Sequence, residues 1–143
     1  MRIIKTEIEI KASLEVVWKI LMDFENYPSW NPFITNISGI PQVGQKLAVM
    51  ICPPGQKGMK FSPKVAELSS QSQFSWKGQF LFPGLFDGEH SFSLQSQKAK
   101  TIFLHQEAFS GLLPHILPQS FFDKTQTGFQ MMNQALKKRA EAQ

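Results

Sequence analysis

The stretch SFFDKTQTGFQMMNQALKKR, residues 120–139, decides the fold of this 143-residue chain. Its apolar side chains recur at helical spacing and fall on one face: Phe122, Thr125, Phe129, Met132 and Leu136. Ser120 is a suitable N-cap for this helix. Gly128 costs helix stability, about 1 kcal/mol relative to Ala, so we expect it to allow a close contact with a neighbouring element. Such a helix needs an apolar surface to cover.

Composition indicates a globular protein, since 42% of residues are apolar and thirteen are Phe. We expect so much aromatic area to form either a bulky core or the lining of a cavity. The net charge is +4, and no basic run alternates with aromatic residues, which argues against nucleic-acid binding. The single Cys52 excludes an internal disulfide.

The N-terminus carries charge where a signal peptide needs an apolar run, and no apolar stretch approaches the roughly 20 residues of a membrane-spanning helix. We therefore expect a cytoplasmic protein without stable membrane insertion.

Alternating apolar and polar residues predict strands before the final helix. The expected strands are residues 4–10, 34–38, 46–51, 61–68, 73–82, 85–95 and 101–110. Pro63 lies inside one of them, which favours an edge or a bulge. Ser13 caps a predicted helix after the first strand, and a second short segment follows it. That segment carries Tyr27, Trp30 and Phe33, and we expect it to fold back over the domain.

Short turns between the strands imply an antiparallel sheet, and the terminal helix would cover its apolar face. The predicted fold is therefore α+β: one domain over residues 1–143, with a curved antiparallel sheet of about seven strands wrapped round a long C-terminal helix and two short helices after the first strand.

Strand alternation also predicts a polar pair inside the sheet. If Lys98 and Ala99 form a turn, His90 lies opposite Glu107 and Phe92 lies opposite His105. An imidazole and a carboxylate would then lie side by side on a face otherwise made of apolar side chains.

The order of elements resembles the helix-grip superfamily of START-like, polyketide cyclase/dehydrase and lipid-transport (SRPBCC) proteins, in particular its small bacterial branch. The resemblance lies in VW at 17–18, YPSWNPF at 27–33, GEHSFSL at 88–94 and GFQMMNQALK at 128–137. It also includes EAFSG at 107–111. It implies a hydrophobic cavity between sheet and helix, but members of this superfamily include carriers, cyclases, receptors and co-chaperones.

Three interpretations of His90 and Glu107 remain open at this point. They could satisfy each other structurally, anchor the polar end of a ligand, or act as an acid–base pair in a cyclase- or dehydratase-like enzyme. The residues expected to contact a ligand are Trp30, Phe33, Trp76, Phe80, His90, Phe92, His105, Glu107, Phe109, Phe129 and Met132. No metal-site spacing is present, and we expect no metal and no cofactor.

The best functional prediction is binding of a hydrophobic small molecule, such as a lipid, a polyketide or an isoprenoid-like compound. The alternatives are the cyclase/dehydratase-like enzyme with His90 and Glu107, and a co-chaperone-like interaction module. A homodimer is possible. The apolar loop 112–117 could close the mouth of the cavity or form a partner surface.

Overall fold

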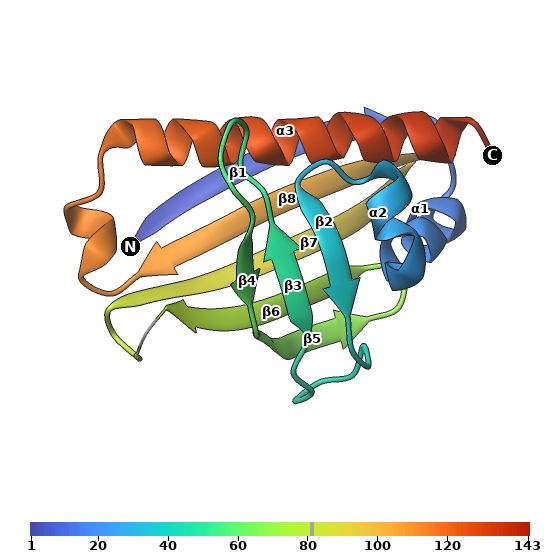
Figure 1. Ribbon diagram of the computed structural model, residues 1–143. Helices are drawn as coiled ribbons and strands as arrows, with labels where there is room; N and C mark the ends of the chain where they lie inside the picture. Colours follow the sequence, from blue (N-terminus) through green and yellow to red (C-terminus); the bar gives the residue numbers. More distant parts are fainter. Residues whose placement is uncertain (81) are drawn as a thin grey trace.

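A computed structural model describes residues 1–80 and 82–143 and confirms the α+β class (Figure 1). Its helical elements are α1 (Leu14–Met22), η1 (Phe24–Asn26), α2 (Tyr27–Trp30), η2 (Leu113–His115) and α3 (Gln119–Glu141). Its strands are β1 (Arg2–Ile10), β2 (Ile34–Ser38), β3 (Ala48–Ile51), β4 (Met59–Phe61), β5 (Lys64–Ser69), β6 (Gln73–Phe80), β7 (Phe86–Gln97) and β8 (Lys100–Ser110).

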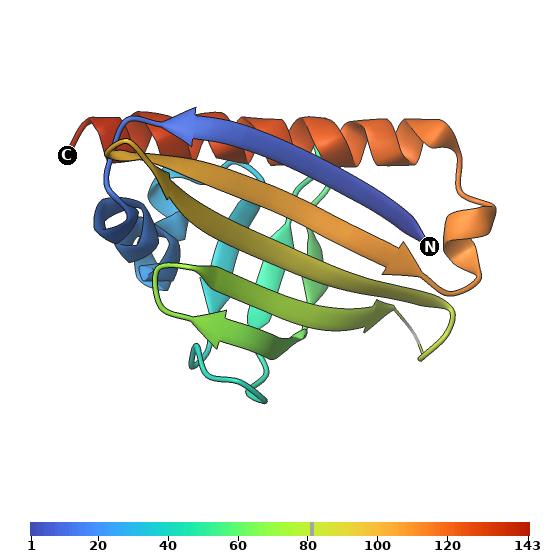
Figure 2. The same cartoon turned by 180° about the vertical axis from the view of Figure 1, so that it is seen from behind.

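The strands form two sheets rather than one. A five-stranded antiparallel sheet has the order β1-β8-β7-β6-β5, and a three-stranded sheet has the order β2-β3-β4. In Figure 1 the small sheet lies in front of the large one, and α3 runs along the β1 side. Figure 2 shows the opposite face of the large sheet, across which no described helix passes. The side chains that the small sheet and α3 enclose against the large sheet form the core.

The two sheets separate at Pro63, where the sequence predicted one strand over residues 61–68. Strand β4 ends at Phe61 and β5 begins at Lys64. Pro63 has no N–H to donate to a ladder, but its carbonyl accepts a hydrogen bond from the Leu47 N–H at 2.8 Å. The chain therefore passes from one sheet to the other at this residue.

The predicted strand register is confirmed. His90 pairs with Glu107, Phe92 with His105, and Leu94 with Phe103. Lys98 and Ala99 form the turn between β7 and β8, and both have positive φ angles, 49° and 66°. A two-residue turn with positive φ at both residues matches the right-handed twist of the strands that it joins. The turn therefore fixes the pairing all along β7 and β8.

Helix α3 begins one residue before the predicted N-cap. Its N-cap is Pro118, which makes no side-chain cap hydrogen bond, and Ser120 lies inside the first turn. The predicted apolar stripe is buried as expected, together with Gly128, Asn133 and Ala140. No helix within residues 1–80 and 82–143 is both long and apolar enough to cross a membrane.

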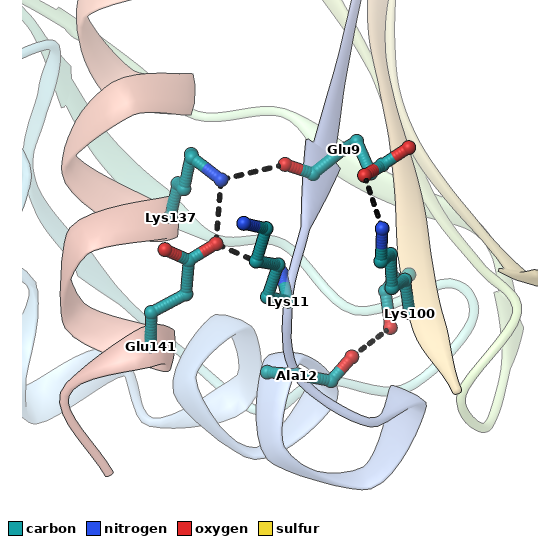
Figure 3. A network of polar contacts seen from close by, with 7 residues as sticks. Glu9, Lys11, Ala12, Lys100, Lys137 and Glu141 are labelled. Atoms are coloured by element: carbon teal, nitrogen blue, oxygen red, sulfur yellow. Dashed lines mark hydrogen bonds and ion pairs between the residues drawn. The ribbon is translucent and has the colours of Figure 1, made fainter. Parts of the chain in front are cut away.

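Polar contacts fasten the C-terminal end of α3 to the end of β1 (Figure 3). Lys137 Nζ donates to the Glu9 carbonyl at 3.0 Å and to Glu141 Oε2 at 2.5 Å. The same Glu141 oxygen accepts the Lys11 N–H at 2.8 Å. The hydrogen bonds from Lys137 and the Lys11 backbone lower the pKa of the Glu141 carboxyl. The helix is thus held at a fixed position along the sheet.

Gly128 allows the close contact that its place in the helix predicted. A Cβ atom added there would lie 2.6 Å from Cε1 of Phe33. Phe33 is held in place because Asn31 Oδ1 accepts the backbone N–H groups of Phe33 and Ile34, at 3.0 and 2.8 Å. The segment with Tyr27 and Phe33 is therefore folded into the domain, as expected, and both side chains are buried.

We predict that Gly128→Ala destabilises the protein. The gain in helix propensity, about 1 kcal/mol, is smaller than the overpacking cost of about 1–3 kcal/mol when the buried Phe33 ring is displaced. Urea unfolding measures the difference. Gln126→Ala on the exposed face of α3 is the control and should leave stability nearly unchanged, and a more stable Gly128→Ala protein would contradict the close packing.

Candidate functional site

A partly open pocket of about 110 Å³ lies between the large sheet, the β3–β4 hairpin and the first half of α3. The sheet contributes Trp76, Gly78, Gly88, Glu107 and Phe109 to its lining. Gln79 of β6 and Phe86 of β7 add to the part that the sheet contributes. The other walls come from Phe33, from the hairpin residues Ile51, Pro53, Met59 and Phe61, from Pro63, and from Phe121 and Thr125 of α3. Most of the surface that a ligand would meet there is apolar.

The structure divides the predicted ligand-contacting residues into two groups. Phe33, Trp76, Glu107 and Phe109 line the pocket. The others that can be placed do not line it: Phe92, His105, Phe129 and Met132 have no exposed surface, His90 is 1% exposed behind Trp76, and Trp30 is half-buried on α2. The side chain of Phe80 lies outside the described part of the structure.

The side chains that have no exposed surface lie in the core because α3 packs directly on the sheet. The Phe129 ring stacks on the His105 ring with centroids 4.0 Å apart and a 6° angle between the planes. That contact leaves no space for a ligand between the middle of the helix and the sheet. Thr125 and Phe121, one and two turns earlier than Phe129, form the helical wall of the pocket instead.

The loop 112–117 does not line the pocket. Leu112 and Ile116 are 68% and 76% exposed, whereas the β3–β4 hairpin occupies the wall opposite the sheet. The interpretation of this loop as the closure of the cavity mouth is therefore wrong for the described pocket.

Glu107 is the only ionisable residue among the described residues that line the pocket. Its side chain is 17% exposed, and its Oε1 lies 2.7 Å from His90 Nδ1. An added Cβ at Gly88 would collide with Glu107 Oε2. Gly88 thus provides the space that the carboxyl group occupies.

The His90–Glu107 contact is one end of a buried chain of hydrogen bonds. His90 Nε2 lies 2.8 Å from His105 Nε2, and His105 Nδ1 lies 2.9 Å from Asn133 Oδ1. Asn133 Nδ2 donates to Thr6 Oγ1 at 2.9 Å, and Thr6 donates to the His105 carbonyl at 3.0 Å. Strands β1, β7 and β8 and helix α3 all contribute to this chain.

The donors and acceptors along the chain fix most of its protons. Asn133 Oδ1 can only accept, so His105 Nδ1 carries a proton. A neutral His105 then accepts at Nε2 from the Nε2–H of His90. One proton remains for the contact between His90 Nδ1 and Glu107 Oε1. The pair is either a carboxylic acid beside a neutral imidazole or a carboxylate beside an imidazolium, and it has no net charge in either state.

Burial keeps His105 neutral. Desolvation lowers the pKa of His105 well below its usual value, and the nearby His90 lowers it further, against the opposing hydrogen bond with Asn133. The aromatic stacking of Phe129 on His105, and of Trp76 on His90 with centroids 4.9 Å apart, keeps water from both rings.

Asn133 and Thr6 belong to this network, although neither was singled out from the sequence. Asn133 follows Phe129 by four residues and precedes Leu136 by three, so its polar side chain falls on the apolar face of α3. A polar residue on a buried face needs a hydrogen-bond partner. The polar residue on the apolar face was therefore the sequence signal for a buried hydrogen bond. Only the packing of α3 against β1 and β8 identifies its partners as Thr6 and His105.

The chain belongs to the polyketide cyclase/dehydrase and lipid transport family. The model of that family matches residues 1–141. A search of curated protein sequences gave no significant match.

Solved structures with the same fold cover nearly the whole chain. A hypothetical protein from Helicobacter pylori has a TM-score of 0.81 at 16% identity, over 97% of this chain and 88% of its own. A START superfamily protein from Mycobacterium smegmatis has a TM-score of 0.77 at 21% identity, over 98% and 97%. An aromatase/cyclase from Streptomyces has a TM-score of 0.77 at 12% identity, over 98% and 93%. At these identities the likeness establishes the helix-grip fold alone.

We predict that stability falls as the pH drops below about 6.5, the usual pKa of histidine. The unfolded chain gains a proton at His105 there, while the folded state, with its lowered pKa, does not. Protonation therefore favours unfolding, by up to about 1.4 kcal/mol per pH unit for this one group. Urea unfolding between pH 7.5 and pH 5 measures the slope.

His115→Gln is the matched control, because His115 is exposed and its removal should leave the slope unchanged. His105→Gln should reduce the slope, whatever its effect on stability at pH 7.5. An identical slope in wild type and His105→Gln would contradict a neutral, buried His105.

Proposed function

We propose that the protein binds an apolar small molecule, such as a lipid, a polyketide or an isoprenoid-like compound, in the pocket bounded by the large sheet, the β3–β4 hairpin and α3. The observation that carries this proposal is the position of Glu107 as the only ionisable group along the described lining of an otherwise mostly apolar pocket. Binding sites for small molecules commonly combine apolar walls with a few placed polar groups. The family to which the chain belongs includes lipid transport in its description.

We predict that filling the pocket at Gly78 prevents binding. Gly78 lines the pocket, and a Cβ there would meet only Pro63, at an ordinary 3.6 Å. Gly78→Leu should therefore fold while its side chain occupies ligand space, and affinity for the neutral fluorescent probe N-phenyl-1-naphthylamine should fall about tenfold or more.

Lys77→Leu is the matched control, since Lys77 is exposed and points to the other face of β6. Its affinity for the probe should equal that of the wild type. Native mass spectrometry of the gently purified protein tests the same proposal without a probe. Equal probe affinity in wild type and Gly78→Leu would contradict ligand binding in this pocket, as would the absence of both retained ligand and probe binding in the wild type.

A second candidate function is acid–base catalysis by Glu107 and His90, similar to that of a cyclase or dehydratase. The specific observation in its favour is the 2.7 Å contact between Glu107 and His90, for which the hydrogen-bond pattern of the network leaves one proton. Beyond His105 the chain continues through the amide of Asn133, which does not exchange protons readily. A proton removed from a substrate by Glu107 would therefore be held by the pair and returned to the same pocket.

Catalysis predicts that the protein accelerates exchange of acidic C–H protons. For 2-tetralone in deuterated buffer, NMR should show faster loss of the C1 proton signal with wild-type protein than with buffer alone. Glu107→Gln removes the base and should reduce the rate to the buffer value while the naphthylamine probe still binds. Equal exchange rates in wild type, Glu107→Gln and buffer would leave binding as the function of the site.

A further inference from the structure

The two oxygens of the Glu107 carboxyl group have different surroundings. Oε1 is engaged by His90 Nδ1 at 2.7 Å. Oε2 lies over Gly88, where an added Cβ would collide with it, and it accepts no hydrogen bond from residues 1–80 or 82–143. Glu107 and Gly88 both line the pocket. Oε2 is therefore the atom of this carboxyl group that is free to meet a ligand.

The shared proton never reaches Oε2. In one state of the pair the proton is on Oε1 and is donated to His90, and in the other it is on His90 Nδ1 and is donated to Oε1. Oε2 is unprotonated in both states and can only accept a hydrogen bond. This conclusion follows from the donors and acceptors of Asn133 and His105, which require His90 to donate from Nε2.

The described lining offers nothing to balance a ligand's negative charge. It contains no Lys, Arg or His side chain. The other polar side chains along it are Thr125, whose hydroxyl donates to the Phe121 carbonyl at 2.8 Å, and Gln79, which is exposed at the rim. An anion in this pocket would lose its hydration and face the acceptor oxygen Oε2 of Glu107, which is unfavourable without a hydrogen-bond donor or a paired cation.

We propose that the pocket selects apolar molecules whose polar end is an uncharged hydrogen-bond donor, a hydroxyl or phenol group, and that Glu107 Oε2 accepts this hydrogen bond. It discriminates against carboxylates, such as fatty-acid anions, because they would lose their hydration and meet only an acceptor oxygen, with no donor or cation to replace the lost water. It discriminates against ethers and esters because their oxygens can only accept and would face another acceptor. This selectivity rests on the proposed binding function and narrows its ligand class.

Four probes of one shape test the selectivity: naphthalene, 2-naphthol, 2-methoxynaphthalene and 2-naphthoate. Calorimetry or fluorescence at pH 7 gives their dissociation constants for the wild-type protein. We expect 2-naphthol to bind about tenfold more tightly than 2-methoxynaphthalene, because the naphthol makes one hydrogen bond that the ether cannot make. We expect 2-naphthoate to bind most weakly of the four.

Glu107→Gln removes the negative charge that the carboxyl group carries in the carboxylate–imidazolium state, and it keeps an acceptor oxygen in the pocket. Its amide N–H can donate to the His90 Nδ1 of a neutral imidazole, which leaves the amide oxygen as an uncharged acceptor at the Oε2 position. The variant should bind 2-naphthoate at least about tenfold more tightly than the wild type does, and should still prefer 2-naphthol to 2-methoxynaphthalene. Glu89→Gln is the matched control, because Glu89 is exposed on the outer side of β7, and it should leave all four constants unchanged.

Equal binding of all four probes by the wild type would overturn the selectivity and leave the pocket as a non-selective apolar site. The same gain for 2-naphthoate in Glu89→Gln as in Glu107→Gln would overturn it too, since net charge alone would then explain the effect. Absence of binding for every probe, naphthalene included, would overturn the proposed ligand binding together with the selectivity.

Discussion

The antiparallel pairing of β7 with β8 is the constraint on which the site depends. A two-residue turn at Lys98 and Ala99 sets its register, and that register places His90 beside Glu107 and Phe92 beside His105. A shift by one residue would turn all four side chains to the other face of the sheet. The chain of hydrogen bonds and the polar point of the pocket therefore both follow from one hairpin.

Helix α3 supplies the remaining contacts of the buried hydrogen-bond network. Asn133 supplies the acceptor that fixes the His105 tautomer, and it is held by Thr6 of β1 on its other side. Phe129 stacks on His105 and closes the middle of the interface, while Gly128 admits the Phe33 ring beside it. The pocket is consequently confined to the first half of the helix, where Phe121 and Thr125 face the β3–β4 hairpin.

Buried polar groups are costly unless each has a partner, and this network meets that condition for His90, His105, Asn133 and Thr6. The exception is Glu107, whose Oε2 is left free at the pocket surface. The hydrogen bonds of the network hold Glu107 Oε2 firmly in place. The carboxyl group cannot rotate without breaking the contact between its Oε1 and His90. Such rigidity suits the recognition of one polar group on an otherwise apolar ligand.

Sequence reasoning was most successful where the interactions are local or periodic. The final helix and the strands depend on contacts within a few turns or within one hairpin. The His90–Glu107 pair also lies within one hairpin, since 17 residues separate the two side chains. It was least successful for the pocket lining. Phe92, Phe129 and Met132 share the faces expected of pocket residues, yet they lie in the core, because alternation identifies the inner face of an element but not what packs on it.

The sequence by itself determined the α+β class, the amphipathic character of α3, the β7–β8 register and the presence of a buried imidazole–carboxylate pair. Each of these depends on periodicity or on a short turn. Only the tertiary structure decided that Pro63 divides the strands between two sheets, that Asn133 and Thr6 meet across 127 residues, and that the β3–β4 hairpin rather than the loop 112–117 forms the far wall of the pocket. These features depend on the docking of distant elements, whose positions are fixed by the combined packing of many side chains and leave no periodic signal in the chain.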